Sequence, residues 1–453
     1  MMSGAVRSRG YWVLLLALAF LPGGCKKDWL DAKTNKNLVV PASLSDFQAL
    51  LDNTDIMNAY SCGIGEIGSD GHTVMPSRWL RESGQEYNAY TWRHDYPVTN
   101  SLDWNTPYRR VAYCNLVLEG LDKINPDNDS DRDWWKALKG NALFQRGRSF
   151  FELAQVYAPA YTTATIPGNW GIPLRLSSDI NIPSVRSTVQ DTYNQVIADL
   201  MAAKDLLPLV PLYKTRPSKP AALALLSRVY LAMEVYGVAF TYADSCLQLT
   251  NRLLDYNMLY DTAPVPRFND EVIFHSTLVN WGNINSDALV DSSLYALYDA
   301  ADRRKTVYFN TSSGIVFKGS YYGGTLLFSG LATDELYLTR AECNARMGNT
   351  AKAMQDVNTL LKKRYKSGFA ELTAADAKDA LSKILLERRK ELLLRGLRWT
   401  DLRRLNHDPA YAVTISHAVP GKNYTLAPDS DHYTFPIPDD IIQLSGMTQN
   451  PGW

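Results

Sequence analysis

The chain has 453 residues, of which 46% are hydrophobic and 21% charged, the balance of a globular protein rather than a disordered one. Lys and Arg together number 47 and so do Asp and Glu, so the net charge is zero and no basic surplus indicates a nucleic-acid partner. The 26 Tyr and 11 Trp, against 13 Phe, favour wet, half-buried binding surfaces because their rings carry a polar group.

Residues 1–24 predict a secretory signal peptide, with two arginines near the start, an unbroken apolar run over 11–21, and glycines just before Cys25. The apolar run is too short to span a membrane as a mature helix. A cysteine at this point is typical of a bacterial lipoprotein, although Pro22 stands where leucine is usual. We therefore expect lipid on Cys25, stable anchoring by several acyl chains, and a tether over 25–42.

The body of the protein is expected over 43–453, with an N-terminal half over 43–215 and a C-terminal half over 216–453. Helical periodicity is absent from 58–107, which is rich in Gly, Asp, Tyr and Trp. A loop region this long inside a compact protein is usually functional or disordered, and so many aromatic residues argue against disorder. This segment is therefore the first place to look for a binding surface.

Three long helices are predicted from apolar residues at helical spacing. They cover 104–124, 133–157 and 188–207. The third opens at Thr188, a good N-cap residue, and stops before Pro208, which cannot continue a helix.

Two later stretches resemble each other and predict paired helices. Ser227 and Ala341 each precede an alanine, Ala239 or Ala353, by twelve positions. This spacing is similar to the tetratricopeptide repeat, in which small side chains let two helices approach closely. The signature tryptophan and proline positions of that repeat are missing, so the spacing alone indicates helix pairs and no more.

The segment between these repeats has mixed character. The stretch 271–276 predicts a short strand, and 314–318 with 325–328 predicts a hairpin whose tip carries Tyr321 and Tyr322.

A last long helix is predicted over 374–406. Glu387 and Glu391 each have a basic residue three or four positions away in it. Ion pairs can therefore form along the helix surface.

A series of motifs runs from the lipoprotein cysteine to the last residue. They are Cys25 with Trp29-Leu30-Asp31, Tyr108 with Cys114-Asn115, the basic and aromatic stretch 146–157 leading to Gly171-Ile172-Pro173-Leu174, the segments 387–392 and 396–404, Phe435-Pro436-Ile437-Pro438, and Gln449-Asn450-Pro451-Gly452-Trp453. In this order they resemble the SusD/RagB family of outer-membrane lipoproteins of Bacteroidota. The C-terminal motifs are the most specific part of the resemblance.

The resemblance implies a mainly α fold in which tetratricopeptide-like helix pairs pack against an irregular lobe with short β-hairpins. It also implies a non-enzymatic lipoprotein at the cell surface. Such a protein binds an oligosaccharide, or a peptide in some members, and delivers it to a TonB-dependent outer-membrane transporter of the SusC type. The segments around Glu387 and 435–438 are expected to be scaffold.

Aromatic residues in the irregular regions are the candidates for ligand binding. A sugar ring has C–H faces that stack on flat side chains, while Asp, Asn and Arg bind its hydroxyl groups. The candidate platforms and polar partners are Trp79, Trp92, Trp281, Tyr321, Tyr322, Asp70, Arg81 and Asn283. For each single aromatic residue, loop packing or a transporter contact is the alternative, but we expect at least two of them to touch ligand.

Two patterns suggest other ligands less strongly. Glycines in 63–68 match the dinucleotide-binding spacing, but no convincing strand precedes them and no helix is predicted after them. Alternating aspartates in 127–133 resemble a calcium loop, yet Arg132 and Leu138 occupy the places of its Gly and Glu. These aspartates favour the start of a helix, with calcium as the alternative. No metal or other cofactor is expected.

Four cysteines remain besides the lipidated one, and exported proteins can form disulfides. Cys114, Cys246 and Cys343 lie at apolar positions of helical segments, which favours free, buried thiols. With Cys62, three pairings are possible and the sequence does not choose among them.

The favoured function is capture of a nutrient, chiefly a glycan, without bond cleavage. A helical-repeat scaffold that binds a protein or peptide is the second hypothesis. A surface glycosidase is the third, because paired carboxylates that meet only in space leave no sequence motif. Starch, fructan, host glycan and peptide all remain open as ligands.

Overall fold

The structure is a computed structural model, and it describes residues 41–79, 84–162, 169–284 and 289–453. Residues Ala42–Trp453 form one compact unit. The predicted signal peptide, Cys25, nearly all of the tether and also Arg81 lie outside the described residues. Within the described ranges, no helix is both long enough and apolar enough to cross a membrane.

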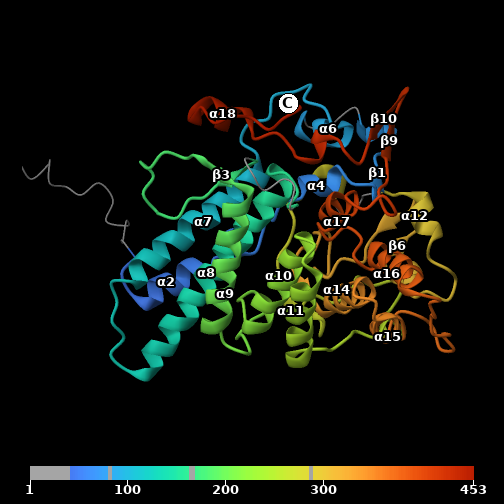
Figure 1. The fold of residues 1–453 in the computed structure, drawn as a ribbon, viewed down its shortest axis with the longest axis horizontal. Coiled ribbons are helices and arrows are strands. Elements are labelled where there is room, and N and C mark those ends of the chain that lie inside the picture. The colour runs from blue at the N-terminus through green and yellow to red at the C-terminus, as the bar shows by residue number, and fades with distance from the viewer. Residues whose placement is uncertain (1–40, 80–83, 163–168, 285–288) are drawn as a thin grey trace, which may run out of the picture. The chain divides into compact units, whose positions relative to one another are not determined.

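The first part of this unit is a bundle of long helices (Figure 1). Helix α2 (Leu44–Leu51) packs on α7 (Leu102–Leu121) and α8 (Asp129–Tyr157), and α8 also packs on α9 (Val189–Leu206). The three long helices predicted from apolar spacing are thus confirmed, with ends that differ by a few residues.

Polar side chains fix where these helices begin. Ser43, Asn128 and Thr188 each accept a hydrogen bond from a backbone N–H of the first turn. The run of aspartates forms the first turn of α8, where Asp129 and Asp131 lie at the positive end of the helix dipole. In the part of the chain that is described, no group of three or more His, Cys, Asp or Glu side chains is arranged to hold a metal ion.

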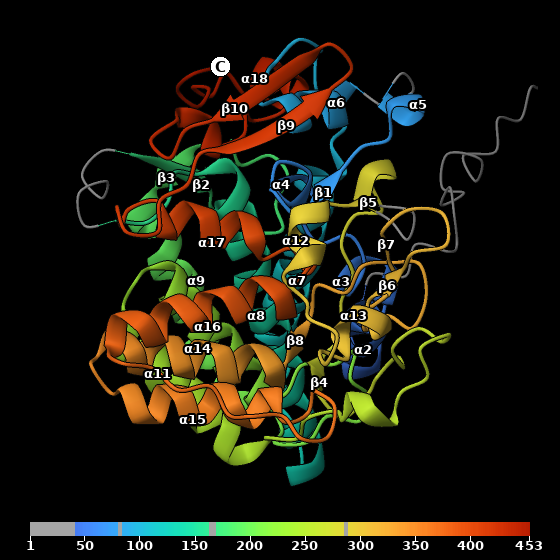
Figure 2. The same cartoon turned by 90° about the vertical axis from the view of Figure 1, so that its right-hand side faces the viewer.

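The predicted helix pairs are present (Figure 2). One pair is α10 (Lys219–Ala232) with α11 (Tyr236–Leu249), and the other is α14 (Thr333–Arg346) with α15 (Thr350–Leu361). Helix α11 packs on α14, so the pairs stack, and α16 (Ala377–Glu391) packs on the second pair.

Small residues allow the close approach within each pair. The hydroxyl of Ser227 donates a hydrogen bond of 3.0 Å to the carbonyl oxygen of Ala239 across the first pair. Ala341 and Ala353 are fully buried in the second pair. The tetratricopeptide-like spacing therefore has the physical role expected of it.

The last long helix is shorter than predicted. Helix α16 ends at Glu391, and a separate helix, α17 (Arg398–Leu405), follows. Between them Leu394 and Gly396 adopt left-handed backbone conformations, with φ of 54° and 75°. A Cβ on Gly396 would lie 2.8 Å from a methyl carbon of Leu278, so glycine also permits close packing here. The prediction of one continuous helix is wrong because this turn redirects the chain.

The β-structure consists of short antiparallel strands. They are β1 (His72–Thr73), β5 (Leu289–Val290), β7 (Val316–Phe317) and β6 (Phe309–Asn310) in one sheet, and the pairs β2 (Trp170–Pro173) with β3 (Arg186–Thr188), β4 (Val272–Phe274) with β8 (Leu331–Ala332), and β9 (Ile415–Val419) with β10 (Lys422–Leu426). Strand β4 confirms the strand predicted over 271–276. The predicted hairpin is wrong, because β7 pairs with β5 and β6 while Phe328 forms a bridge with Thr277.

Several short helices connect these parts. They are α3 (Thr54–Met57), α4 (Ile64–Ile67), α5 (Pro76–Trp79), α6 (Gly84–Thr91), α12 (Ser292–Ala296), α13 (Arg304–Val307), α18 (Asp439–Ser445) and the 3-10 turns η2 (Tyr256–Met258), η3 (Gly282–Ile284) and η4 (Asp431–Tyr433). Helices α4, α5, α6 and the start of α7 lie in the segment 58–107, so the prediction that this segment lacks helices is wrong. Figure 2 shows α5, α6 and the β9–β10 hairpin together at one end of the body.

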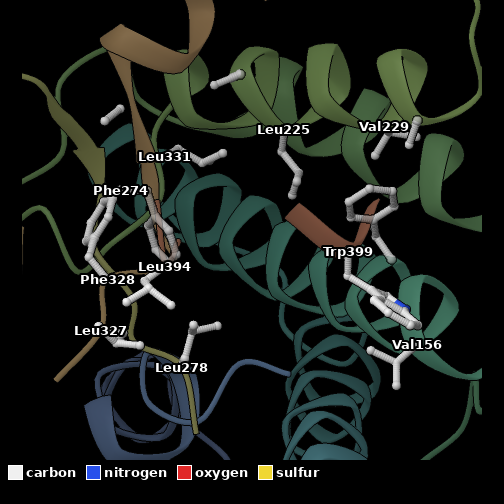
Figure 3. Close-up of a cluster of buried hydrophobic side chains, with 14 of the residues drawn as sticks. Val156, Leu225, Val229, Phe274, Leu278, Leu327, Phe328, Leu331, Leu394 and Trp399 are labelled. Carbon is white, nitrogen blue, oxygen red and sulfur yellow. The ribbon is translucent and has the colours of Figure 1, made fainter. Parts of the chain in front are cut away.

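An apolar core joins the bundle to the helix pairs. Figure 3 shows buried side chains from α8, α10, β4, β8 and α17 that meet there, among them Val156, Leu225, Val229, Phe274, Leu331 and Trp399. Helix α4 packs against the same tryptophan, and a Cβ on Gly65 would lie 2.9 Å from its Cγ. The glycines of 63–68 therefore serve close packing, which agrees with the rejection of a nucleotide site.

The four cysteines in the described part of the chain are free thiols. Cys114, Cys246 and Cys343 are buried, as predicted, and burial raises the pKa of each to about 12. Cys62 is partly buried, and its thiol donates to the carbonyl oxygen of Asp103 at 3.1 Å.

A buried ionic cluster joins the segment between the repeats to α16. Arg304 donates to Glu387 at 2.6 Å and to Glu391 at 2.9 Å. Arg364 donates to the other oxygen of Glu391 at 2.7 Å and to Glu271 at 2.7 Å. Both arginines are fully buried, so each of these charges depends on its partners for solvation.

We predict that Glu391→Gln destabilises the protein by about 3–5 kcal/mol, because two buried guanidinium groups each lose one of their carboxylate partners. The midpoint of urea unfolding measures this loss. The control is Glu371→Gln, which breaks a surface ion pair with Lys362 and should cost less than about 1 kcal/mol. A Glu391→Gln midpoint equal to that of the control would contradict the prediction.

Candidate functional site

Two of the predicted platforms are core residues. Trp92 is 2% exposed and its Nε1 donates to the carbonyl oxygen of Gly68 at 3.0 Å. Tyr321 is also 2% exposed, and its hydroxyl lies between the carboxylates of Glu271 and Asp334. Neither ring offers a face on which a ligand can stack, so the prediction of a platform is wrong for both.

Asp70 is occupied by an ion pair. Its two carboxylate oxygens accept hydrogen bonds from Arg398 at 2.6 and 2.9 Å, and Arg389 lies 3.0 Å away. Burial alone would raise the pKa of Asp70, but these two arginines lower it to about 2. The carboxylate is thus part of the scaffold rather than a free acceptor for sugar hydroxyls.

The remaining candidates fall into two places. Tyr322 is half-buried in a separate cluster, with the Arg267 guanidinium 4.7 Å from its ring centre and His275 stacked on it at 6.0 Å. Trp281 and Asn283 belong to the turn η3 region, next to α5 and α6, although the side chain of Asn283 lies outside the described residues. The sequence did not show that Tyr322 lies in a different place from Trp281 and Asn283.

A buried carboxylate holds the indole of Trp281 in place. Its Nε1 donates to Asp103 at 2.9 Å, and the same carboxylate accepts the backbone N–H of Ile64 at 2.9 Å. Burial raises the pKa of Asp103 to about 6, against the lowering effect of these hydrogen bonds. The Asp103 carboxylate therefore links the Trp281 indole to the start of α4. This indole is half-buried and lies near α5.

Trp79 is the predicted platform that belongs to a larger aromatic surface. Its ring packs on Tyr87 with centroids 4.8 Å apart, and Tyr87 packs edge-on against Tyr96 at 5.2 Å. The hydroxyl of Tyr87 lies 3.4 Å from that of Tyr424 on β10. We call Trp79, Tyr87, Tyr96 and Tyr424 the aromatic ledge. Tyr96 is 49% exposed and the other three are partly exposed or half-buried, so ring faces and hydroxyl groups are accessible together.

A buried histidine holds the two halves of the aromatic ledge together. His417 of β9 is stacked between Tyr90 of α6, at 4.0 Å, and Trp92, at 4.5 Å. Its ring nitrogens lie 2.7 Å from the carbonyl oxygen of Tyr90 and 2.9 Å from that of Ser69. Burial lowers the pKa of His417, and the two carbonyl oxygens oppose this shift. The hairpin is thereby fixed against α6, which brings Tyr424 beside Tyr87.

Charged and amide side chains surround the aromatic ledge. Lys422 lies 4.4 Å from the ring centre of Tyr424, and Arg93 pairs with Asp95 at 2.8 Å. These residues and Asn423 are exposed. The surface thus offers flat apolar faces with hydrogen-bonding groups at their edges, the combination that a polyhydroxylated ring requires.

A larger groove lies elsewhere, with a volume of about 580 Å³ between α7, the segment 173–184 and α18. Its lining is mainly serine, asparagine and aliphatic residues. It offers one half-buried ring, that of Tyr108, because its other ring, Trp104, is 4% exposed. The groove therefore suits a sugar less well than the aromatic ledge does.

The sequence prediction missed three of the four ledge residues. Tyr87 and Tyr96 lie in the segment that was singled out as aromatic-rich, but nothing ranked them above their neighbours. Tyr424 lies 337 positions from Tyr87, and only the alternation of 422–425 after a Pro-Gly turn could have indicated a hairpin with an outward ring.

Known proteins resemble this chain along most of its length. Residues 28–231 match a family model described as "Starch-binding associating with outer membrane", and residues 333–453 match one described as "SusD family". SusD-like protein P2 of Formosa agariphila is 24% identical, with 94% of this chain and 92% of that protein covered.

Solved structures share the fold. A putative sugar-binding protein of Bacteroides vulgatus has a TM-score of 0.74 at 22% identity, covering 92% of this chain and all of the other. A laminarin-binding SusD-like protein has a TM-score of 0.64 at 18% identity, covering 90% and 98%. The two family models match residues 28–231 and 333–453, which together are most of the chain, and they show that this chain belongs to the SusD family.

Proposed function

We propose that this protein is a lipid-anchored outer-membrane lipoprotein that captures a glycan on the aromatic ledge and passes it uncut to a transporter of the SusC type. The observation that carries the proposal is the ledge itself, four adjacent aromatic side chains with accessible faces and a polar rim. Among the described residues no comparable group of exposed rings faces the 580 Å³ groove.

The chemistry of the aromatic ledge favours a carbohydrate over a purely apolar ligand. Trp79 and Tyr96 present ring faces, whereas the hydroxyl groups of Tyr87 and Tyr424 and the ammonium group of Lys422 are hydrogen-bonding groups beside them. A sugar exposes both C–H faces and hydroxyl groups, so one ligand can satisfy both. Trp281 lies near enough to α5 to extend the surface, and we retain it as a proposed contact.

Family relatives guide the choice of ligand. A glycan is supported by the sugar-binding and laminarin-binding relatives, which share the fold. Transfer to a transporter is supported by the family resemblance of the chain, and lipid anchoring by the signal sequence and Cys25.

We predict that the protein is retarded by at least one polysaccharide in an affinity gel containing laminarin, starch or fructan. Trp79→Ala and Tyr424→Ala should each raise the Kd about tenfold or more, about 1.4 kcal/mol of lost stacking energy. The matched control is Trp170→Ala, an exposed tryptophan of the separate β2–β3 sheet, which should bind as the wild type does.

Unfolding midpoints of the three variants should stay near that of the wild type, because the replaced side chains are exposed or half-buried. Unchanged retardation of both ledge variants would refute the site. Release of shorter sugars from the bound polysaccharide would instead refute capture without cleavage.

We also predict that Cys25 carries the lipid. Mass spectrometry of the N-terminal peptide from native membranes should show an acylated cysteine at position 25, and Cys25→Ser should release the protein from the membrane fraction. Several acyl chains bind a bilayer far more tightly than one, so the release should be nearly complete. A membrane-bound Cys25→Ser protein would contradict this prediction.

A further inference from the structure

An inner polar cavity lies apart from the aromatic ledge. It has a volume of about 50 Å³ and lies between α4, α8, α10 and the 395–400 segment. Val156, Leu225, Leu278 and Trp399 form the apolar part of its wall (Figure 3). None of the four ledge residues lines it.

One wall of the cavity carries an excess of positive charge. Arg110 and Arg148 share Glu152 as their carboxylate, at 3.1 Å for Arg110 but at 3.6 Å for Arg148. Arg228, which also lines the cavity, is already paired with Glu335 at 2.6 Å. Two buried guanidinium groups therefore depend on one carboxylate, and an uncompensated buried charge is costly.

The guanidinium of Arg148 is not fully hydrogen-bonded. Its Nη2 donates to the carbonyl oxygen of Met57 at 2.6 Å and its Nε faces the Glu152 carboxylate at 3.6 Å, but Nη1 has no acceptor among the described residues. Nε1 of Trp399, another cavity residue, has none there either. Arg148 is 4% exposed and Trp399 2%, so these N–H groups are buried. Burial and the nearby Arg110 lower the pKa of Arg148 to about 9, as expected for a charge in need of a counter-ion.

A single carboxyl group on the opposite wall controls the sign of the cavity charge. Glu66 is 1% exposed, and burial raises its pKa to about 7. The backbone N–H of Gly396 and the charge of Arg398 lower this pKa, while the charges of Asp70 and Asp401 raise it. Below about pH 7 the carboxyl is protonated and neutral, so it no longer repels an anion. Above that pH it is ionised and opposes one.

We propose that this cavity binds one small monovalent anion, such as chloride, at Nη1 of Arg148, with Nε1 of Trp399 as a second N–H group of the same cavity. The anion supplies the negative charge that Glu152 cannot give to two arginines at once. Binding is stronger when Glu66 is protonated. The site is independent of the proposed glycan surface, and it makes the stability of the body depend on the anion present.

The test compares thermal unfolding of the full chain in sodium chloride and in sodium gluconate of equal ionic strength. At about pH 6, and at a chloride concentration ten times the Kd for chloride, the unfolding midpoint should be about 1–2 °C higher in chloride than in gluconate. The rise of the midpoint with chloride concentration should saturate as expected for one site. The difference should shrink at about pH 8. Glu66→Gln should keep the chloride effect at both pH values, and Arg148→Met should abolish it.

A crystal of the wild-type protein soaked in bromide gives a second readout that needs no folded variant. An anomalous peak beside Arg148 is expected. Equal midpoints in chloride and gluconate, or no bromide peak in the cavity, would overturn the proposal, and would mean that Glu66 alone balances the charge of Arg148.

Discussion

The paired charges of Glu391, Arg304 and Arg364 are the constraint on which the rest of the fold depends. Three elements far apart in the chain contribute to them, and each guanidinium is fully buried. A buried ion pair adds little net stability compared with an apolar contact, but it tolerates almost no alternative arrangement, because a displaced partner leaves a bare charge. The irregular segment between the repeats is thereby held in one position on the helix stack.

Scaffold and binding surface are built from different parts of this protein. Ion pairs, small residues at helix contacts and the Trp399 core occupy the interior, whereas the aromatic ledge uses α5, α6 and a terminal hairpin at one end of the body. Loops and edges can change without disturbing the packed interior. This division is consistent with retention of the fold in solved relatives at 18–22% identity.

The regular helices were predictable because each is specified locally, by apolar spacing, a capping residue or a small residue at a close contact. Glu387 does pair with Lys390 along α16, as the spacing indicated, whereas Glu391 binds arginines from other elements. The break at Gly396 depends on packing against Leu278, which is distant in sequence. For the same reason composition could not distinguish buried Trp92 from half-buried Trp79, since burial is decided by partners such as His417.

The β9–β10 hairpin has a consequence for when binding ability arises. One wall of the aromatic ledge comes from α6, near the beginning of the body, and the other from strands made almost last. Contacts between such distant parts form late, because a long loop of chain must close first. A chain truncated before β9 would therefore keep most of its helical body and still lack Tyr424, one wall of the aromatic ledge.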